Sequence, residues 1–214
     1  INLSLPNLKE LLCGVNMLTS LNISNLVALE KIDYSSNTQL PPVNFSGLNN
    51  VKHVICHSNG LSSIANLSSL SNLESLECSN NNFTELDLSS FIHLETLDCN
   101  NNQLTSLNLT GLNLKHLNCY NNVQLPLIDF TQFPNLEYLG CSNNVLQNAV
   151  NVTNCPNLRF LSCNSLQLTA LDLSNCSELE FVYCFNNLLT TLELNHLQNL
   201  ILLLCYNNQL TTLF

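Results

Sequence analysis

The chain is poor in charge, and especially in positive charge. Its 214 residues include five Lys and Arg residues against fifteen Asp and Glu residues, for a net charge of −10. Because so few basic side chains can neutralise few phosphates, the composition argues against a nucleic-acid partner. The negative sign likewise argues against binding to an anionic membrane surface.

Long apolar runs and catalytic motifs are also missing. No run reaches the roughly 18 apolar residues that a membrane-spanning helix requires, so we expect no membrane insertion. The sequence shows no signal peptide, no Gly-rich phosphate loop, no H-E-x-x-H motif and no Ser-His-Asp set. We therefore expect a protein that is not an enzyme and that uses no cofactor.

What the chain has instead is asparagine, 38 residues of it, and a repeat. The pattern LxxLxCxxNxLxxLxLSxxxx recurs at spacings of 20 to 22 residues, and positions are numbered here from the first residue of each unit. The units begin at Leu8, Leu29, Val51, Leu73, Leu94, Leu114, Leu136, Leu158, Leu179 and Leu200. The chain opens mid-pattern at Ile1 and stops mid-pattern at Phe214, so we expect residues 1–214 to be one repeat domain and part of a longer protein.

The pattern predicts two extended segments in each unit. Apolar positions 4 and 6 alternate with polar neighbours, which indicates a strand whose positions 3, 5 and 7 point outward. The later LxxLxL, as in residues 104–109 and 168–173, predicts a second strand-like flank, and short segments rich in Asn and Ser disfavour helix. The asparagine at position 9 can satisfy backbone groups buried in the turn. Leu166 is the exception in that column, and we expect a local distortion there or a rescue by Asn164.

This pattern resembles the leucine-rich repeat, whose signature is L-x-x-L-x-[LC]-x-x-N at a period of 20 to 29 residues. The nested form resembles the bacterial 21-residue class called the IRREKO type, here with Cys at the sixth position. The resemblance implies an all-β-rich solenoid, a right-handed coil of about ten units. A parallel sheet would cover one face, short strands or turns the other, with no substantial helix. It also implies a secreted or cell-surface location and protein or glycan binding.

Nine cysteines form a single column at position 6, namely Cys13, Cys56, Cys78, Cys99, Cys119, Cys141, Cys163, Cys184 and Cys205. One cysteine per coil without C-x-x-C spacing argues against a metal site. The strand spacing exceeds the roughly 3.8 Å between Cβ atoms that a disulfide prefers, so we predict buried free thiols. Tyr34 takes this slot in the second unit and must tilt out or strain the core. Cys155 and Cys176 lie in another column, also predicted core, with a disulfide between them as the alternative.

Outward positions in the last five units are unusually apolar. The predicted ligand-binding residues are Tyr138, Phe160, Phe181, Tyr183, Phe185 and Tyr206, with Tyr120 and His116 beside them. An exposed apolar patch rich in Tyr and Phe is typical of interaction sites and of sugar-stacking platforms. We therefore predict a recognition module that binds a protein or glycan. The alternative is a structural spacer or assembly segment. Its patch would be buried against a flanking domain of the same chain or against another subunit.

Two further sets of residues, an acidic cluster and a column of hydroxyl side chains, could carry function. Glu74, Glu77, Glu95 and Asp98 could bind Ca²⁺ weakly or act as an acid–base pair, although a solvated acidic face is the simpler interpretation. Hydroxyls at coil spacing would suit an ice- or surface-binding array, a weaker alternative that Pro41, Pro126 and Gln147 interrupt. That column contains Thr19, Ser62, Thr84, Thr105, Thr169, Thr190 and Thr211.

Overall fold

The computed structural model describes residues 5–126, 128–144 and 150–213. Some predictions fall on residues outside these ranges. They are the cut ends of the repeat pattern, at residues 1–4 and at Phe214, and Gln147 in the column of hydroxyl side chains. The described chain confirms the predicted parallel β-solenoid with almost no helix. It divides into two compact units, residues 1–112 and 113–214, which are taken in turn. None of the helices in the described ranges is long and apolar enough to cross a membrane.

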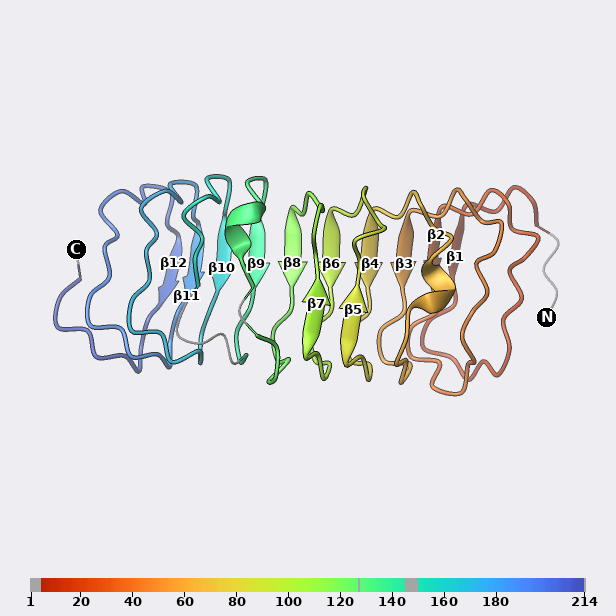
Figure 1. Cartoon of the computed structure of the whole chain (residues 1–214), viewed down its shortest axis with the longest axis horizontal. Helices are drawn as coiled ribbons and strands as arrows, with labels where there is room; N and C mark the ends of the chain where they lie inside the picture. Colours follow the sequence, from red (N-terminus) through yellow and green to blue (C-terminus); the bar gives the residue numbers. More distant parts are fainter. Residues whose placement is uncertain (1–4, 127, 145–149, 214) are drawn as a thin grey trace. The chain divides into compact units, whose positions relative to one another are not determined.

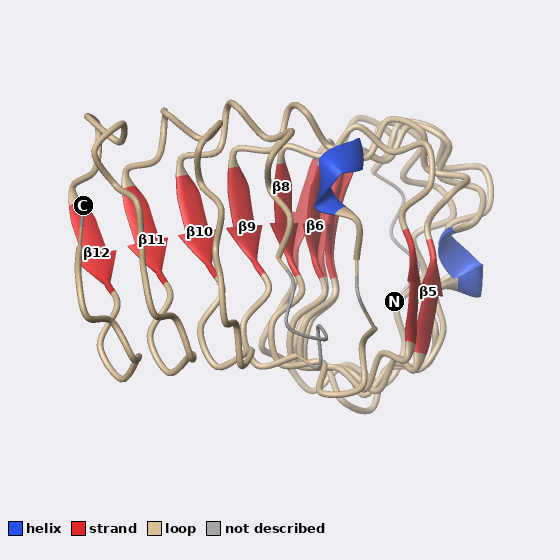
Figure 2. Cartoon of the chain, turned by 60° about the vertical axis from the view of Figure 1, so that its left-hand side comes forward, coloured by secondary structure: helices blue, strands red, loops and turns tan. Residues whose placement is uncertain are grey.

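The first unit is built on five short parallel strands, one from each coil (Figure 1). They are β1 (Glu10–Leu12), β2 (Lys31–Asp33), β3 (His53–Ile55), β4 (Ser75–Glu77) and β6 (Thr96–Asp98). A parallel pair, β5 (Glu85–Asp87) and β7 (Ser106–Asn108), lies across the interior from this sheet (Figure 2). One 3₁₀ turn, η1 (Ala65–Leu67), completes the unit.

The second unit repeats the arrangement with five more parallel strands, which run side by side in Figure 2. They are β8 (His116–Asn118), β9 (Tyr138–Gly140), β10 (Phe160–Ser162), β11 (Phe181–Tyr183) and β12 (Leu202–Leu204). A 3₁₀ turn, η2 (Phe130–Gln132), begins after Asp129, whose carboxylate accepts from the Thr131 backbone N–H at 3.0 Å.

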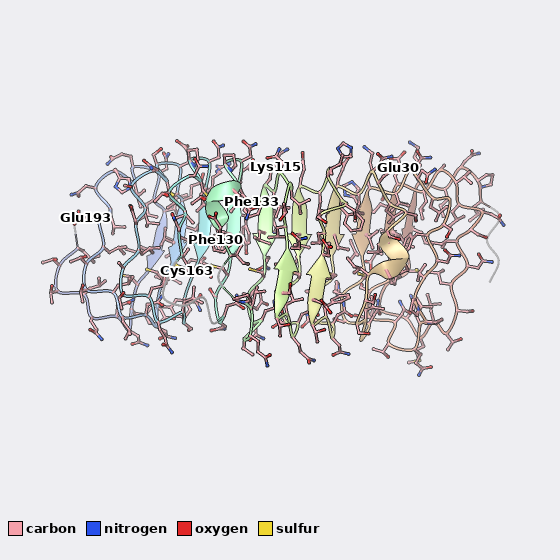
Figure 3. The ribbon with its side chains drawn as sticks, viewed as in Figure 1. Glu30, Lys115, Phe130, Phe133, Cys163 and Glu193 are labelled. Atoms are coloured by element: carbon pink, nitrogen blue, oxygen red, sulfur yellow. The ribbon has the colours of Figure 1, made fainter. Side chains whose placement is uncertain are left out.

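Apart from the flank strands β5 and β7, every strand starts at position 3 and ends at position 5, as the alternation predicts, and the ladders pair equal positions of successive units. The middle residue of each strand points into the core, where Leu76, Leu139 and Val182 are fully buried. Phe130, Phe133 and Cys163, labelled in Figure 3, are buried in the second unit. The apolar half of the consensus is therefore the core.

The second flank is only partly extended. The prediction holds for residues 104–109, which contain β7, but residues 168–173 form no strand. In the second unit no flank strand occurs among the residues that the structure describes. A flank strand needs a pairing partner in the neighbouring coil, and a pattern within one coil does not reveal whether that partner is in register.

The turn after each strand depends on the asparagine at position 9. The Asn81 amide nitrogen donates to the carbonyls of Cys56, Cys78 and Ser79 at 3.0–3.2 Å, and its oxygen accepts from the backbone N–H groups of Asn59 and Leu61. Each such side chain thus closes its own turn and bonds to the preceding coil. The prediction for this column is confirmed.

Leu166 interrupts the column without the predicted rescue by Asn164, but with the predicted local distortion: Gln167 has a positive φ of 59°, which no other described non-Gly residue outside position 8 shares. Its side chain is buried, and the Asn164 carbonyl oxygen instead accepts from the hydroxyls of Ser142 and Ser162. The next asparagine, Asn187, still accepts from the backbone N–H groups of Leu166 and Leu168. The ladder therefore resumes at the following coil.

Position 8 carries a feature that the apolar pattern does not reveal. All ten residues there adopt a left-handed backbone, with φ between 51° and 59°. Asn occupies six of these positions and tolerates that conformation well, whereas Val15 is strained in it. The Asn-Asn pair at positions 8 and 9 was the available signal, because Asn is the residue other than Gly that most readily takes positive φ.

Candidate functional site

The cysteines form a core ladder and no reactive site. All eleven are free thiols, and nine of them are fully buried. Burial raises the pKa of the Cys56 thiol to about 12, against a partial lowering by its hydrogen bond with Tyr34, and it raises the pKa of Cys184 to about 12. A nucleophilic or metal-binding cysteine needs the opposite shift, toward the thiolate. Tyr34 lies inside, 2% exposed, so of the two expected outcomes the tilt out of the core does not occur.

Cys155 and Cys176 are buried in the second column as predicted. Their sulfurs donate to the carbonyls of Phe130 and Val152, each at 3.4 Å, so both thiols have partners in the preceding coil. Burial raises the pKa of Cys155 to about 11 and that of Cys176 to about 12. These groups are also held as neutral thiols.

Two residues of the acidic cluster in the first unit, Glu74 and Asp98, are already engaged. Glu74 pairs with Lys52 at 2.7 Å, which lowers the pKa of the glutamate chiefly through that hydrogen bond. Asp98 accepts from the backbone N–H of Asn100 at 3.3 Å and from its amide group. No group of three or more His, Cys, Asp or Glu side chains suited to a metal ion occurs within the described ranges.

The second unit brings the predicted aromatic residues together on its strand face. We call His116, Tyr120, Tyr138, Phe160, Phe181, Tyr183, Phe185 and Tyr206 the aromatic face. At position 3 the rings of His116 and Tyr138 stack at 4.1 Å and 11°, and those of Tyr138 and Phe160 at 4.3 Å and 2°. The parallel ladder explains this stacking, because it holds equal positions of neighbouring coils at one strand spacing.

The stack ends in rings of different orientation. Phe181 is tilted by 40° against Phe160, and Tyr183 meets Phe160 edge to face at 5.1 Å and 78°. Tyr183 is therefore turned across the stack, whereas the rings before it cover one another's faces and present their edges. Phe185 and Tyr206 form a second stacked pair at 4.7 Å.

Tyr120 lies two residues beyond β8, half-buried, at position 7 of its coil. The rings of the aromatic face are half-buried except Tyr206, which is 55% exposed.

Position 7 corrects part of the predicted map. Large side chains there reach solvent, but small polar ones are buried, including Ser142 and Asn164. The Ser142 hydroxyl bonds to the hydroxyl of Ser162 at 2.9 Å and donates to the Asn164 amide oxygen at 2.6 Å. A short side chain at this position folds back into the coil turn, so these residues lie beneath the face and are not exposed on it.

Sequence reasoning also missed the close approach at Gly140. A side chain there would place its Cβ 2.5 Å from the Asn118 amide oxygen and 3.5 Å from the Tyr138 ring. Asn118 is buried, and its amide oxygen has no hydrogen-bond partner in the described part of the chain. Gly140 thus gives Asn118 and Tyr138 room to lie against the strand. The lone Gly within a strand pattern was the signal for such an approach.

The aromatic face is uncharged at its centre and charged at its rim. Positions 3, 5 and 7 of the second unit contain no Asp, Glu, Lys or Arg. At position 2, beside the stack, Arg159 donates to Glu180 at 3.0 Å. An aromatic centre with a polar rim is the anatomy of a protein interface.

Comparison with known proteins supports the repeat assignment. Residues 71–112 match the family model described as leucine-rich repeats in two copies. Two solved structures superpose with a TM-score of 0.75: the functional domain of InlJ from Listeria monocytogenes, 26% identical, and a leucine-rich-repeat protein of Leptospira interrogans, 23% identical. They align with 96% and 92% of this chain. The structure of InlJ is described as including a cysteine ladder, which confirms the predicted resemblance to bacterial leucine-rich-repeat proteins with this feature.

The aligned chain spans 55% of the InlJ structure and 60% of the Leptospira structure. A third similar structure is Toll in the Toll–Spatzle complex of Drosophila, with 21% identity, a TM-score of 0.66, and coverage of 89% of this chain and 31% of that chain. No curated protein matches the chain. The leucine-rich-repeat fold supports a protein-interaction module.

Proposed function

We propose that this leucine-rich-repeat chain is a non-catalytic recognition module of a secreted or cell-surface bacterial protein. The module binds a protein or glycan ligand through the aromatic face. The observation that carries the proposal is the uncharged, ring-lined strand face of the second unit with its charged rim. The similarity to InlJ supports a bacterial surface context and adhesion.

Ring orientation favours a protein over a glycan. A sugar stacks on an open ring face, but Tyr138 is covered on both sides by His116 and Phe160. The edges that the stack presents carry the positive part of the ring quadrupole and suit the π faces and carbonyl oxygens of a protein partner. Tyr183, turned across the stack, is the ring best placed for a sugar, so a glycan ligand would depend on it most strongly.

The test selects ligands in two arms and locates them with variants. A displayed library of random 12-residue peptides and a glycan array are probed with the chain, with a Phe181→Ala/Tyr183→Ala variant, and with a Glu77→Gln/Asp98→Asn variant of the other unit. Because central aromatic side chains dominate interface energies, we expect the aromatic variant to lose about 100-fold in affinity for a selected ligand. The acidic variant should bind like the parent chain.

Both variants should keep the parent's far-UV circular dichroism, because none of the four substituted side chains is fully buried. Unchanged affinity of the aromatic variant would contradict the proposal. Concentration-dependent association of the parent chain in light scattering, abolished by the aromatic variant, would instead favour an assembly segment whose patch is buried in a subunit contact.

The ice-binding alternative stays weaker. The Thr105 hydroxyl donates to the Thr84 carbonyl at 3.1 Å and is engaged within the flank. A thermal-hysteresis measurement tests this alternative directly.

A further inference from the structure

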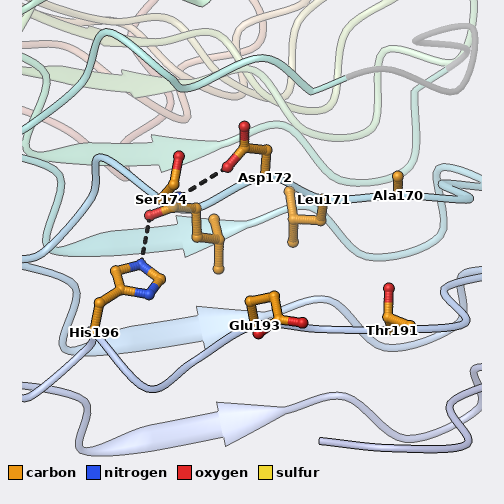
Figure 4. A pocket seen from close by; sticks show the side chains of 8 residues that line it. Ala170, Leu171, Asp172, Ser174, Thr191, Glu193 and His196 are labelled. Carbon is orange, nitrogen blue, oxygen red and sulfur yellow. Dashed lines mark hydrogen bonds between the residues drawn. The ribbon is translucent and has the colours of Figure 1, made fainter. Parts of the chain in front are cut away.

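A cavity of about 290 Å³ lies on the flank of the second unit, in a part of the fold that the proposed function does not use. It opens between residues 170–174 of one coil and residues 191–196 of the next (Figure 4). Its lining contains Ala170, Leu171, Asp172, Leu173, Ser174, Thr191, Glu193 and His196. The lining is thus partly aliphatic and partly charged.

The flank is unpaired at this cavity. In the first unit β5 and β7 join successive coils at the equivalent positions. No backbone hydrogen bond joins residues 170–174 with 191–196 in the described chain, where the last rung before the gap is Leu188 N–H to Leu168 carbonyl. The cavity thus lies between two flank segments that form no backbone ladder.

Hydrogen bonds within the chain hold the polar groups around the cavity in place. The Asp172 carboxylate accepts from the Ser174 backbone N–H at 2.9 Å through one oxygen. The hydrogen bonds from Ser174 are the main cause that lowers the pKa of Asp172, with a smaller contribution from His196. His196 must carry its proton on Nε2, because that nitrogen lies 2.8 Å from the Leu173 carbonyl oxygen, which can only accept (Figure 4).

The charge at this cavity is not balanced within the chain. Neither Asp172 nor Glu193 forms an ion pair with a basic side chain in the described ranges. Glu193 replaces the Asp or Asn that closes the same short turn in other coils, such as Asp87, Asn108 and Asn151, and its longer side chain lines the cavity instead. The arrangement does not suit a metal ion, since no group of three or more metal-ligating side chains is found there or elsewhere in the described residues.

From this cavity we infer a binding site for an aliphatic ammonium group, in which Leu171 and Ala170 contact the carbon chain and Asp172 and Glu193 accept from the ammonium. The aliphatic walls exclude a fully hydrated inorganic cation, and the two carboxylates select the positive sign. The same chemistry is offered by a free alkylamine and by a lysine side chain of another protein.

Both sources can be tested on the whole chain by NMR, with the His196 imidazole signal as the reporter. The probes are cadaverine, the peptide acetyl-Gly-Lys-Gly-amide, and 1-pentanol as the uncharged analogue. We expect saturable shifts of the His196 signal at millimolar cadaverine or peptide and none with pentanol, with an apparent affinity that falls as salt is raised. Stronger binding of cadaverine points to a free amine, and stronger binding of the peptide to a lysine side chain.

Three variants establish the site. Asp172→Asn with Glu193→Gln should weaken binding by about tenfold or more, because two charge-assisted hydrogen bonds become neutral. Asp172→Asn preserves the turn, since Asn108 and Asn151 form the same turn elsewhere. Ala170→Phe should block binding by filling the cavity without a change in charge. Asp87→Asn, the same substitution in the same kind of turn outside the cavity, should have no effect.

Absence of a saturable His196 shift at about 20 mM of either amine would overturn the inference, because binding that weak is not selective. Equal shifts in the parent chain and in the Asp172→Asn/Glu193→Gln variant would overturn it as well. This test is independent of ligand binding at the aromatic face, so either proposal can fail without the other.

Discussion

Replacement of Asn81 by Ala should lower the free energy of unfolding by about 4 kcal/mol. The buried amide makes five hydrogen bonds to backbone groups of two coils. Its removal takes away the acceptor shared by the N–H groups of Asn59 and Leu61, whereas the carbonyls of Cys56, Cys78 and Ser79 each keep a second donor. A buried polar group that loses its only partner costs about 1–3 kcal/mol, and relaxation of the turn recovers part of the sum. Urea unfolding followed by far-UV circular dichroism measures the effect.

Asn72→Ala is the matched control. Asn72 is exposed and makes a single hydrogen bond to the Asn49 carbonyl, at 2.9 Å. We expect its loss to cost less than about 1 kcal/mol. If Asn81→Ala proved as mild as Asn72→Ala, the turns would be held by the apolar core, and the asparagine column would be a by-product of the left-handed turn.

The second large effect is expected at alkaline pH. Burial raises the pKa of Cys56, Cys176 and Cys184 to about 12 and that of Cys155 to about 11 in the folded chain, above the ordinary value near 9. A group whose pKa is raised by folding favours the folded state while it stays protonated. Its contribution is complete below about pH 8.5 and is lost as the pH rises toward the folded value.

Unfolding free energy should therefore fall steeply between about pH 9 and pH 11. Each such thiol contributes at most about 1.4 kcal/mol per pH unit in this window, and the two cysteine columns together contain several. Urea midpoints at pH 7, 9 and 10.5 measure the slope. A Cys155→Ala/Cys176→Ala variant starts less stable but should show a shallower slope, because it titrates two fewer buried thiols. A flat profile up to pH 10.5 would show that the thiols ionise freely and that the ladder is not a sealed core.

The sequence predicted the directions of side chains well and their contacts poorly. The alternation at positions 4 and 6 placed the ten strands of positions 3 to 5, because a residue's inward direction follows from the period of the backbone alone. The same alternation could not reveal that Ser142 and Asn164 turn back into the coil, since that depends on side-chain length. Nor could it reveal that Tyr138 is covered on both faces by its neighbours, which depends on the rotamers of three successive units.

The candidate sites differ in the same way. The aromatic residues were predicted because apolar side chains at outward positions contradict a solvent-exposed face. The flank cavity was not, because residues 168–173 carry the same LxxLxL pattern as the paired residues 104–109. Whether two neighbouring flanks pair is a property of both coils together, and the cavity lies where they do not pair.

The central claim, that recognition lies on the strand face of the second unit, is tested most directly by hydrogen–deuterium exchange with and without a ligand from the library selection. We predict that the ligand protects segments 116–120, 138–142, 160–164 and 181–185, and leaves the exchange of residues 85–87 and 106–108 unchanged. Protection confined to the flank residues, with unchanged exchange in the strands that carry the aromatic face, would contradict the account.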